Sequence, residues 1–140
     1  MKEIRRLKKG DEALIERMHS TFFSDDWQQL NTGFLDNPHN YLYYAYANGE
    51  IGGFLLGYCL ERPDTRIPMF FLYEIEVLEP FQRRGLGVML LEAFKSGVLA
   101  AGGTNYFVLT NASNLPAMGM YAKAGGVSQH SDVVMFDFDL

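Results

Sequence analysis

Apolar residues recur with two different spacings along the chain, and the spacing predicts which segments are helices and which are strands. Residues 11–22 have apolar side chains at three- and four-residue intervals, which predicts a helix with Asp11 at its cap. Before this helix, Ile4 and Leu7 stand among charged neighbours and predict a short, half-exposed strand. The polar stretch 24–40 predicts a short helix followed by a loop.

The clearest local signal is a pair of aromatic and aliphatic runs on either side of Asn48-Gly49, in "YLYYAYANGEIGGFLLGYCL". Asn-Gly tolerates the positive φ angles of a tight turn, so the two runs predict an antiparallel hairpin. The segment "MFFLYEIEVLEP" predicts a long strand that ends at Pro80, because proline cannot donate a ladder hydrogen bond.

The second half of the chain alternates between helical and extended patterns. A helix is expected to begin near residue 86 and to stop at Gly102-Gly103. Its apolar face is expected to hold Leu86, Leu90, Leu91, Phe94, Val98 and Leu99. The segment "NYFVLT" predicts a buried strand, "NLPAMGMYAKAGG" a short helix with Asn114 at the cap, and "VVMFDFDL" a final strand.

This order of elements predicts an α/β fold with a mixed sheet flanked by helices. Strand-helix-strand crossovers favour parallel pairing, whereas hairpins are antiparallel. A length of 140 residues without repeats or low-complexity linkers fits one domain over residues 1–140.

Composition and charge narrow the function. The net charge of −5 argues against nucleic acid as the main partner and agrees with a cationic ligand. With Cys59 as the single cysteine, no intrachain disulfide can form. The basic start "MKEIRRLKKGDE" lacks the apolar run of a secretory signal, and no run of about 18 apolar residues exists to span a membrane. We therefore expect a cytoplasmic protein.

The segment "FQRRGLGVMLL" places arginines and glycines where a strand gives way to a helix. A helix start of this kind presents unpaired N–H groups and a partial positive charge, which suit a phosphate. A Walker-type loop is excluded because Val88 follows the second glycine, and a dinucleotide fingerprint because Leu90 replaces the third.

A third phosphate motif does match. Residues 82–87, "QRRGLG", fit Gln/Arg-x-x-Gly-x-Gly/Ala, the coenzyme A pyrophosphate turn of the GNAT superfamily of N-acetyltransferases. The stretches "YEIEVLEPFQRRGLG", "NLPAMGMYAKAGG" and "VMFDFDL" resemble those of the small aminoglycoside 3-N-acetyltransferases over roughly residues 41–140. The resemblance implies a GNAT fold, acetyl-CoA as the acetyl donor and direct transfer that requires no metal.

The resemblance also implies where the coenzyme lies. The pantetheine arm is expected to pair with the backbone of Ile75 to Val77, and the pyrophosphate to meet the amides of Arg83 to Val88, with attraction from Arg83 and Arg84. The coenzyme-binding residues implied are Ile75, Glu76, Val77, Gln82, Arg83, Arg84, Gly85, Leu86, Gly87, Val88, Asn114 and Ala117.

Two catalytic roles are implied in the same way. Tyr121 occupies the position of the tyrosine that protonates the departing thiolate, and Glu74 that of the acid which removes a proton from the acceptor ammonium. Glu76 shares the face of Glu74 in a regular strand, although the strand of the superfamily commonly bulges here, which could separate the two. Glu76 or a water relay remains an alternative base.

The expected acceptor is a small polycationic amine, foremost the 3-amino group of an aminoglycoside. Candidate acceptor residues are Asp25, Asp26, Trp27, Tyr73, Asp137 and Asp139. A polyamine, a metabolite amine, a protein N-terminus, or a silent acyl-CoA sensor remain alternatives. Dimers are usual among relatives of this kind, so we expect a homodimer.

Overall fold

The computed structural model describes residues 1–22, 31, 33–64, 66–128 and 132–140. Its centre is a five-stranded sheet in the order β1-β2-β3-β4-β5. The strands are β1 (Lys2–Arg6), β2 (Asn40–Ala47), β3 (Glu50–Leu60), β4 (Met69–Val77) and β5 (Phe107–Val108). Pairing is antiparallel from β1 to β4 and parallel between β4 and β5, so the predicted mixed sheet is confirmed.

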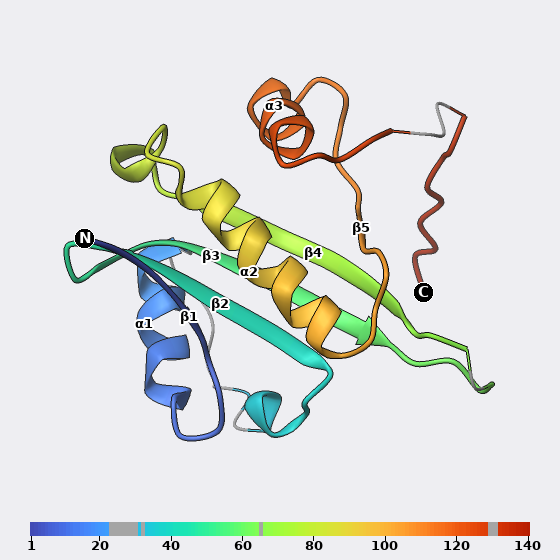
Figure 1. Ribbon diagram of the computed structural model, residues 1–140, viewed down its shortest axis with the longest axis horizontal. Coiled ribbons are helices and arrows are strands. Elements are labelled where there is room, and N and C mark those ends of the chain that lie inside the picture. The colour runs from blue at the N-terminus through green and yellow to red at the C-terminus, as the bar shows by residue number, and fades with distance from the viewer. Residues whose placement is uncertain (23–30, 32, 65, 129–131) are drawn as a thin grey trace.

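Helices cover both faces of this sheet. They are α1 (Glu12–Phe22), α2 (Leu86–Ala100) and α3 (Leu115–Lys123), with short 3₁₀ helices η1 (Phe34–Asp36) and η2 (Glu79–Phe81). Figure 1 shows α2 in front of the sheet, running along the strands, and α3 beyond the end at which α2 begins. The apolar residues of α1 pack on the opposite face from α2.

The β2–β3 hairpin turns where the sequence predicts. Asn48 and Gly49 have φ angles of 53° and 82°, which suit the tight turn that connects strands with the native twist. The pairing register shifts between Ala45 and Tyr46, whose partners are Gly53 and Ile51, so Gly52 is an extra residue that forms a bulge in β3.

Phe94 is the centre of the core between α2 and the sheet. Its side chain is fully buried, and its ring meets those of Tyr41 and Tyr106 edge-on at 5.6 and 5.0 Å. A Cβ at Gly57 of β3 would lie 2.5 Å from the Phe94 ring, so only glycine lets the helix approach this closely.

A smaller core lies between α1 and the other face. The predicted apolar face of α1 packs here, with Leu14, Ile15, Met18 and Phe22 against Leu42, Tyr44 and Phe54. The Tyr44 hydroxyl donates a 2.8 Å hydrogen bond to the Leu14 carbonyl, so this buried tyrosine also fixes the helix to the sheet.

Three expectations need correction. Residues 133–140 form no strand, because none of the described strands pairs with them. The sequence predicts a buried strand over the segment 105–110, but β5 is two residues long and Phe107 is exposed. Leu99 is exposed, because it lies about 100° around the helix from Val98, which is buried.

Phe94→Ala is expected to lower the free energy of unfolding by about 3–5 kcal/mol, since it leaves a cavity in the larger core. Leu99→Ala on the same helix removes an exposed side chain and should change it by less than about 0.5 kcal/mol. Urea unfolding followed by circular dichroism measures both. Equal losses in the two variants would contradict this account of the core.

Candidate active site

A bulge in β4 sets the direction of the two central carboxylates. Glu74 pairs with Leu56 of β3 and Leu72 with Gly57, so Tyr73 is an extra residue between two paired positions. Glu76 pairs with Phe54. Leu56 and Phe54 both belong to the core on the α1 side, so Glu74 and Glu76 share that face as predicted, immediately after the bulge.

Glu74 borders a hollow of about 230 Å³ between α1 and the sheet. The other lining residues are Ile15, Met18, Asn31, Phe34, Leu42, Phe54 and Leu56. Burial disfavours the charged carboxylate, and repulsion from Glu76 adds to this, so the pKa of Glu74 is raised. A carboxylate with a raised pKa at the wall of an apolar hollow is suited to accept a proton from a bound ammonium.

Next to Glu74, four rings from three strands form an aromatic group. Tyr73 meets Tyr58 edge-on at 6.1 Å and Phe71 at 5.8 Å. Phe71 stacks on Phe107 of β5 at 4.7 Å. The Tyr73 side chain is largely exposed, so its ring is accessible beside Glu74.

β4 has an open edge on its β5 side. The parallel pairing with β5 covers only Phe71 and Leu72. Further along, residues 75–77 pair with β3 on one side, and no described strand pairs with them on the other. An extended ligand segment can therefore hydrogen-bond to this edge as an added strand does.

The turn before α2 concentrates amide groups at the end of that open edge. Arg83 and Gly85 have φ angles of 62° and 84°, and the first helical hydrogen bond runs from the Met89 amide to the Gly85 carbonyl at 3.0 Å. No amide from residues 83–88 donates a hydrogen bond to another group in the described part of the chain. These N–H groups are thus available to an anion.

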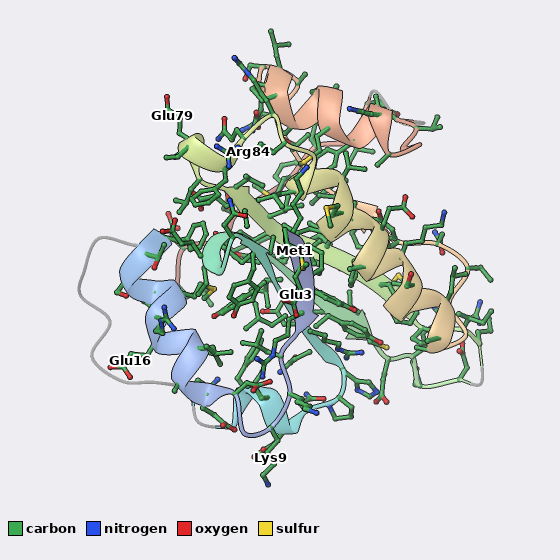
Figure 2. All side chains as sticks on the ribbon, turned by 60° about the vertical axis from the view of Figure 1, so that its left-hand side comes forward. Met1, Glu3, Lys9, Glu16, Glu79 and Arg84 are labelled. Carbon is green, nitrogen blue, oxygen red and sulfur yellow. The ribbon has the colours of Figure 1, made fainter. Side chains whose placement is uncertain are left out.

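Side chains from outside the turn hold it in place. The Gln82 side-chain amide donates a 2.8 Å hydrogen bond to the Val77 carbonyl, and the Lys2 ammonium donates one to the Arg84 carbonyl. Figure 2 shows Arg84 between η2 and the start of α2, at the same end of the molecule as α3. A Cβ at Gly87 would lie 2.4 Å from the Met120 sulfur, so this glycine lets α3 pack against the turn.

Tyr121 of α3 is half-buried, and burial raises the pKa of its phenol, which therefore stays protonated at neutral pH. It packs against the core on the α2 side, whereas Glu74 lies on the α1 side, so the open edge of β4 lies between the two. Asn114 caps α3 by accepting a 3.2 Å hydrogen bond from the Ala117 amide. Asn114 and Ala117 were both expected to contact the coenzyme, but here the Asn114 side-chain oxygen and the Ala117 amide bond to each other.

Among the described residues, the remaining acceptor candidates do not line the hollow. Asp137 and Asp139 lie on the exposed C-terminal segment and are not among the described residues that line it. Asp25, Asp26 and Trp27 lie outside the described residues. The apolar lining from α1 was missed in the sequence, because Ile15 and Met18 have the same spacing as ordinary core residues.

Other features of the described chain bear on the chemistry. No group of three or more His, Cys, Asp or Glu side chains is placed to hold a metal ion within the described ranges. None of the described helices is both long and apolar enough to cross a membrane. Cys59 of β3 is half-buried, and burial followed by the charge of Glu61 raises the pKa of its thiol.

Comparison with known proteins finds acetyltransferases, both by family and among individual relatives. A sequence model of the acetyltransferase (GNAT) family matches residues 5–126. An N-alpha-acetyltransferase of Sulfurisphaera tokodaii is 28% identical over 145 aligned positions, which cover 88% of this chain and 85% of that protein.

Solved structures extend the comparison. An aminoglycoside acetyltransferase from an uncultured soil metagenomic sample superposes with a TM-score of 0.88 at 25% identity, covering 100% of this chain and 99% of that one. An aminoglycoside antibiotic 6′-N-acetyltransferase from Acinetobacter baumannii has a TM-score of 0.74 at 16% identity over 100% of this chain and 99% of its own. The second likeness is one of fold alone.

Glu76→Gln is expected to lower the pKa of Glu74, because it removes a negative charge that opposes ionisation of the neighbouring carboxyl. Glu92→Gln, on the exposed side of α2, removes the same charge from the other face of the sheet and should leave the titration of Glu74 unchanged. Carboxyl-carbon NMR over a pH series measures both. An unshifted Glu74 in Glu76→Gln would show that the two carboxylates do not face the same space.

Proposed function

Because the chain belongs to the acetyltransferase (GNAT) family, we propose that it transfers the acetyl group of acetyl-CoA to a primary amine of a small polycationic acceptor, foremost the 3-amino group of an aminoglycoside. In this proposal it acts in the cytoplasm as a single domain over residues 1–140, forms a homodimer, and confers antibiotic resistance. The observation that carries the proposal is the uncommitted amide row of residues 83–88 at the end of the open β4 edge.

The donor side of the site follows from that row. The GNAT family uses acetyl-CoA, which supplies an activated acetyl thioester. The amides of residues 83–88 bind its pyrophosphate, and each charge-assisted hydrogen bond contributes about 1.5–3 kcal/mol. Arg83 and Arg84 add positive charge at the same place, and the backbone of Ile75 to Val77 pairs with the pantetheine arm as an edge strand pairs with a peptide.

Glu74 acts as the general base. An acceptor amine arrives as an ammonium ion and has to lose a proton before its nitrogen lone pair can attack the acetyl carbon. The pKa of Glu74 is raised and so lies closer to the pKa of an amine, which makes its carboxylate a stronger base than that of an exposed glutamate. Glu76, on the same face, remains the alternative base, as does a water molecule between Glu74 and the amine.

Tyr121 acts as the general acid. As the carbon–nitrogen bond forms and the carbon–sulfur bond breaks, negative charge develops on the leaving sulfur, and the phenol proton moves to it. Burial keeps Tyr121 protonated and ready to donate. The attacking nitrogen loses a second proton as the amide forms, and this proton restores the Tyr121 phenol, directly or through water. The proton taken by Glu74 leaves to solvent, so the products are the amide, the free thiol and one proton. Their positions on opposite sides of β4 agree with a thioester that reaches through its open edge.

The acceptor is proposed to bind on the α1 side. The carboxylates of Glu74 and Glu76 attract an ammonium group, and Tyr73 offers a flat ring against a sugar face. The net charge of −5 favours the approach of a polycation. Contacts from Asp25, Asp26, Trp27, Asp137 and Asp139 remain part of the proposal.

A second candidate is acetylation of a protein N-terminus. The relative that matches over 88% of the chain is an N-alpha-acetyltransferase. An α-amino group has a lower pKa, about 7.7–8.0, than an alkyl amine such as that of lysine, so it loses its proton to Glu74 more easily. Polyamines, metabolite amines and a silent acyl-CoA sensor also remain alternatives, and the choice among them is an experimental one.

The experiment that tests the proposal measures thiol release from acetyl-CoA with three acceptor panels: gentamicin-type aminoglycosides, polyamines and short peptides with free N-termini. We expect acetyl-CoA to raise the melting temperature and the aminoglycosides to give turnover, with NMR of the product locating the acetyl group at the 3-amino nitrogen. Turnover with peptides alone would establish the second candidate. A melting temperature raised by acetyl-CoA without any thiol release would indicate the sensor.

Glu74→Gln and Tyr121→Phe are each expected to lower the turnover number roughly 10²–10⁴-fold, because each removes one proton-transfer group. Coenzyme binding should change little, and Glu74→Gln should also abolish the fall in rate at acid pH. Glu92→Gln and Tyr46→Phe change the same residue types at positions that do not line the hollow, and they serve as matched controls. An unchanged rate in either catalytic variant would remove that residue from the mechanism.

A further inference from the structure

Lys2 is the first residue of β1, and its side chain contacts the turn that precedes α2. Its ammonium donates a hydrogen bond to the Arg84 carbonyl, although the two residues are 82 positions apart in the sequence. β1 stands at the end of the strand order opposite to β5. Figure 1 shows the N-terminus at the end of the sheet where α2 begins. This contact therefore connects the amide row of residues 83–88 to a strand that does not border β4.

The register of β1 places Lys2 on the α2 side of the sheet. Lys2 pairs with Ala47, and Ile4 pairs with Ala45. Both alanines belong to the core between α2 and the sheet, and Ile4 packs against it. Because side chains alternate along a strand, Lys2 shares this face with Ile4, and a slip of one residue would move both to the α1 side. The packing of Ile4 thus specifies the face on which the Lys2 side chain lies.

Backbone hydrogen bonds just beyond each end of β1 hold this register. Before the strand, the Asn48 amide donates a 2.9 Å hydrogen bond to the Met1 carbonyl. After it, the Leu7 amide donates one of 2.8 Å to the Leu42 carbonyl. Lys2 is an exposed residue, but its backbone is fixed from both directions. Its ammonium therefore reaches the Arg84 carbonyl from a defined point on the sheet.

The Arg84 carbonyl and the Gly85 amide belong to the same peptide group. In a trans peptide group the C=O and N–H bonds point in opposite directions. A hydrogen bond that holds the carbonyl toward β1 therefore directs the Gly85 N–H away from β1. This N–H is one of the amides of residues 83–88 that donate to no other group in the described part of the chain. A cation at the carbonyl also polarises the peptide group, which makes the N–H a stronger donor.

We propose that Lys2 is a positioning residue for the acetyl donor, because it orients the peptide group between Arg84 and Gly85 so that the Gly85 N–H meets the pyrophosphate. The inference rests on the donor site proposed above and adds to it a residue from outside the arginine-glycine turn. Gly85 has a φ of 84° and, as a glycine, restrains the rotation of this peptide group only weakly. The hydrogen bond from Lys2 supplies the missing restraint. Lys2 acts through the carbonyl and does not itself contact the coenzyme.

Calorimetric titration with coenzyme A and with 3′-dephospho-coenzyme A tests this role. Lys2→Met is expected to raise both dissociation constants about tenfold, and by the same factor, because both ligands contain the pyrophosphate. Lys2→Arg keeps a cationic donor and should retain most of the affinity. Lys8→Met removes the same charge from an exposed lysine beyond the other end of β1, so it should bind as the wild type does. Wild-type affinity in Lys2→Met, or a loss confined to coenzyme A, would overturn the inference.

NMR of the chain labelled with nitrogen-15 glycine separates positioning from a general loss of structure. At saturating coenzyme A, the Gly85 amide proton is expected to shift downfield in the wild type and clearly less in Lys2→Met, because its N–H no longer points at the phosphate. The KM for acetyl-CoA should rise about tenfold with kcat unchanged, since only binding is weakened. Equal Gly85 shifts in the two chains would contradict the inference even if affinity falls. A wild-type chain that binds neither coenzyme form would overturn the proposed donor site, and this inference with it.

Discussion

The unequal pairing of β4 is the constraint on which the site depends. β4 is hydrogen-bonded to β3 along most of its length but to β5 over only two residues. Its remaining edge is therefore open, with Glu74 on one side of the sheet and Tyr121 on the other. The bulge at Tyr73 adds to this, because the extra residue sets the face on which Glu74 and Glu76 lie. The proposed base Glu74, the proposed acid Tyr121 and the open edge for the acetyl donor therefore all lie around β4.

Much of the fold could be predicted because local chemistry and tertiary packing favour the same structure. The sequence predicts a tight turn at Asn48-Gly49, and both residues have the positive φ angles of such a turn in the structure. Gly85, the N-cap of α2 with a φ of 84°, marks both the start of the helix and the row of amides. Asn114 caps α3 through its own side chain, as its position before Pro116 indicates.

Other features could not be predicted, because they depend on distant partners. Alternation in residues 133–140 shows that the segment is suited to a sheet, but it does not specify which edge it joins. Ile15 and Met18 have the period of a packed helix, and only the three-dimensional arrangement shows that they also line a hollow beside Glu74. The spacing of Glu74 and Glu76 does not reveal the bulge at Tyr73, since a regular strand places both on one face as well; only the family resemblance leads one to expect a bulge here.

Cys59 has a practical consequence for work with this protein. The thiolate is the reactive form of cysteine, and burial together with the nearby charge of Glu61 favours the protonated thiol. Alkylating or disulfide-exchanging reagents are therefore expected to react slowly with Cys59 at neutral pH. A colorimetric assay for a released thiol therefore has a low background from the protein itself. A cysteine introduced at an exposed position can likewise be labelled selectively without first replacing Cys59.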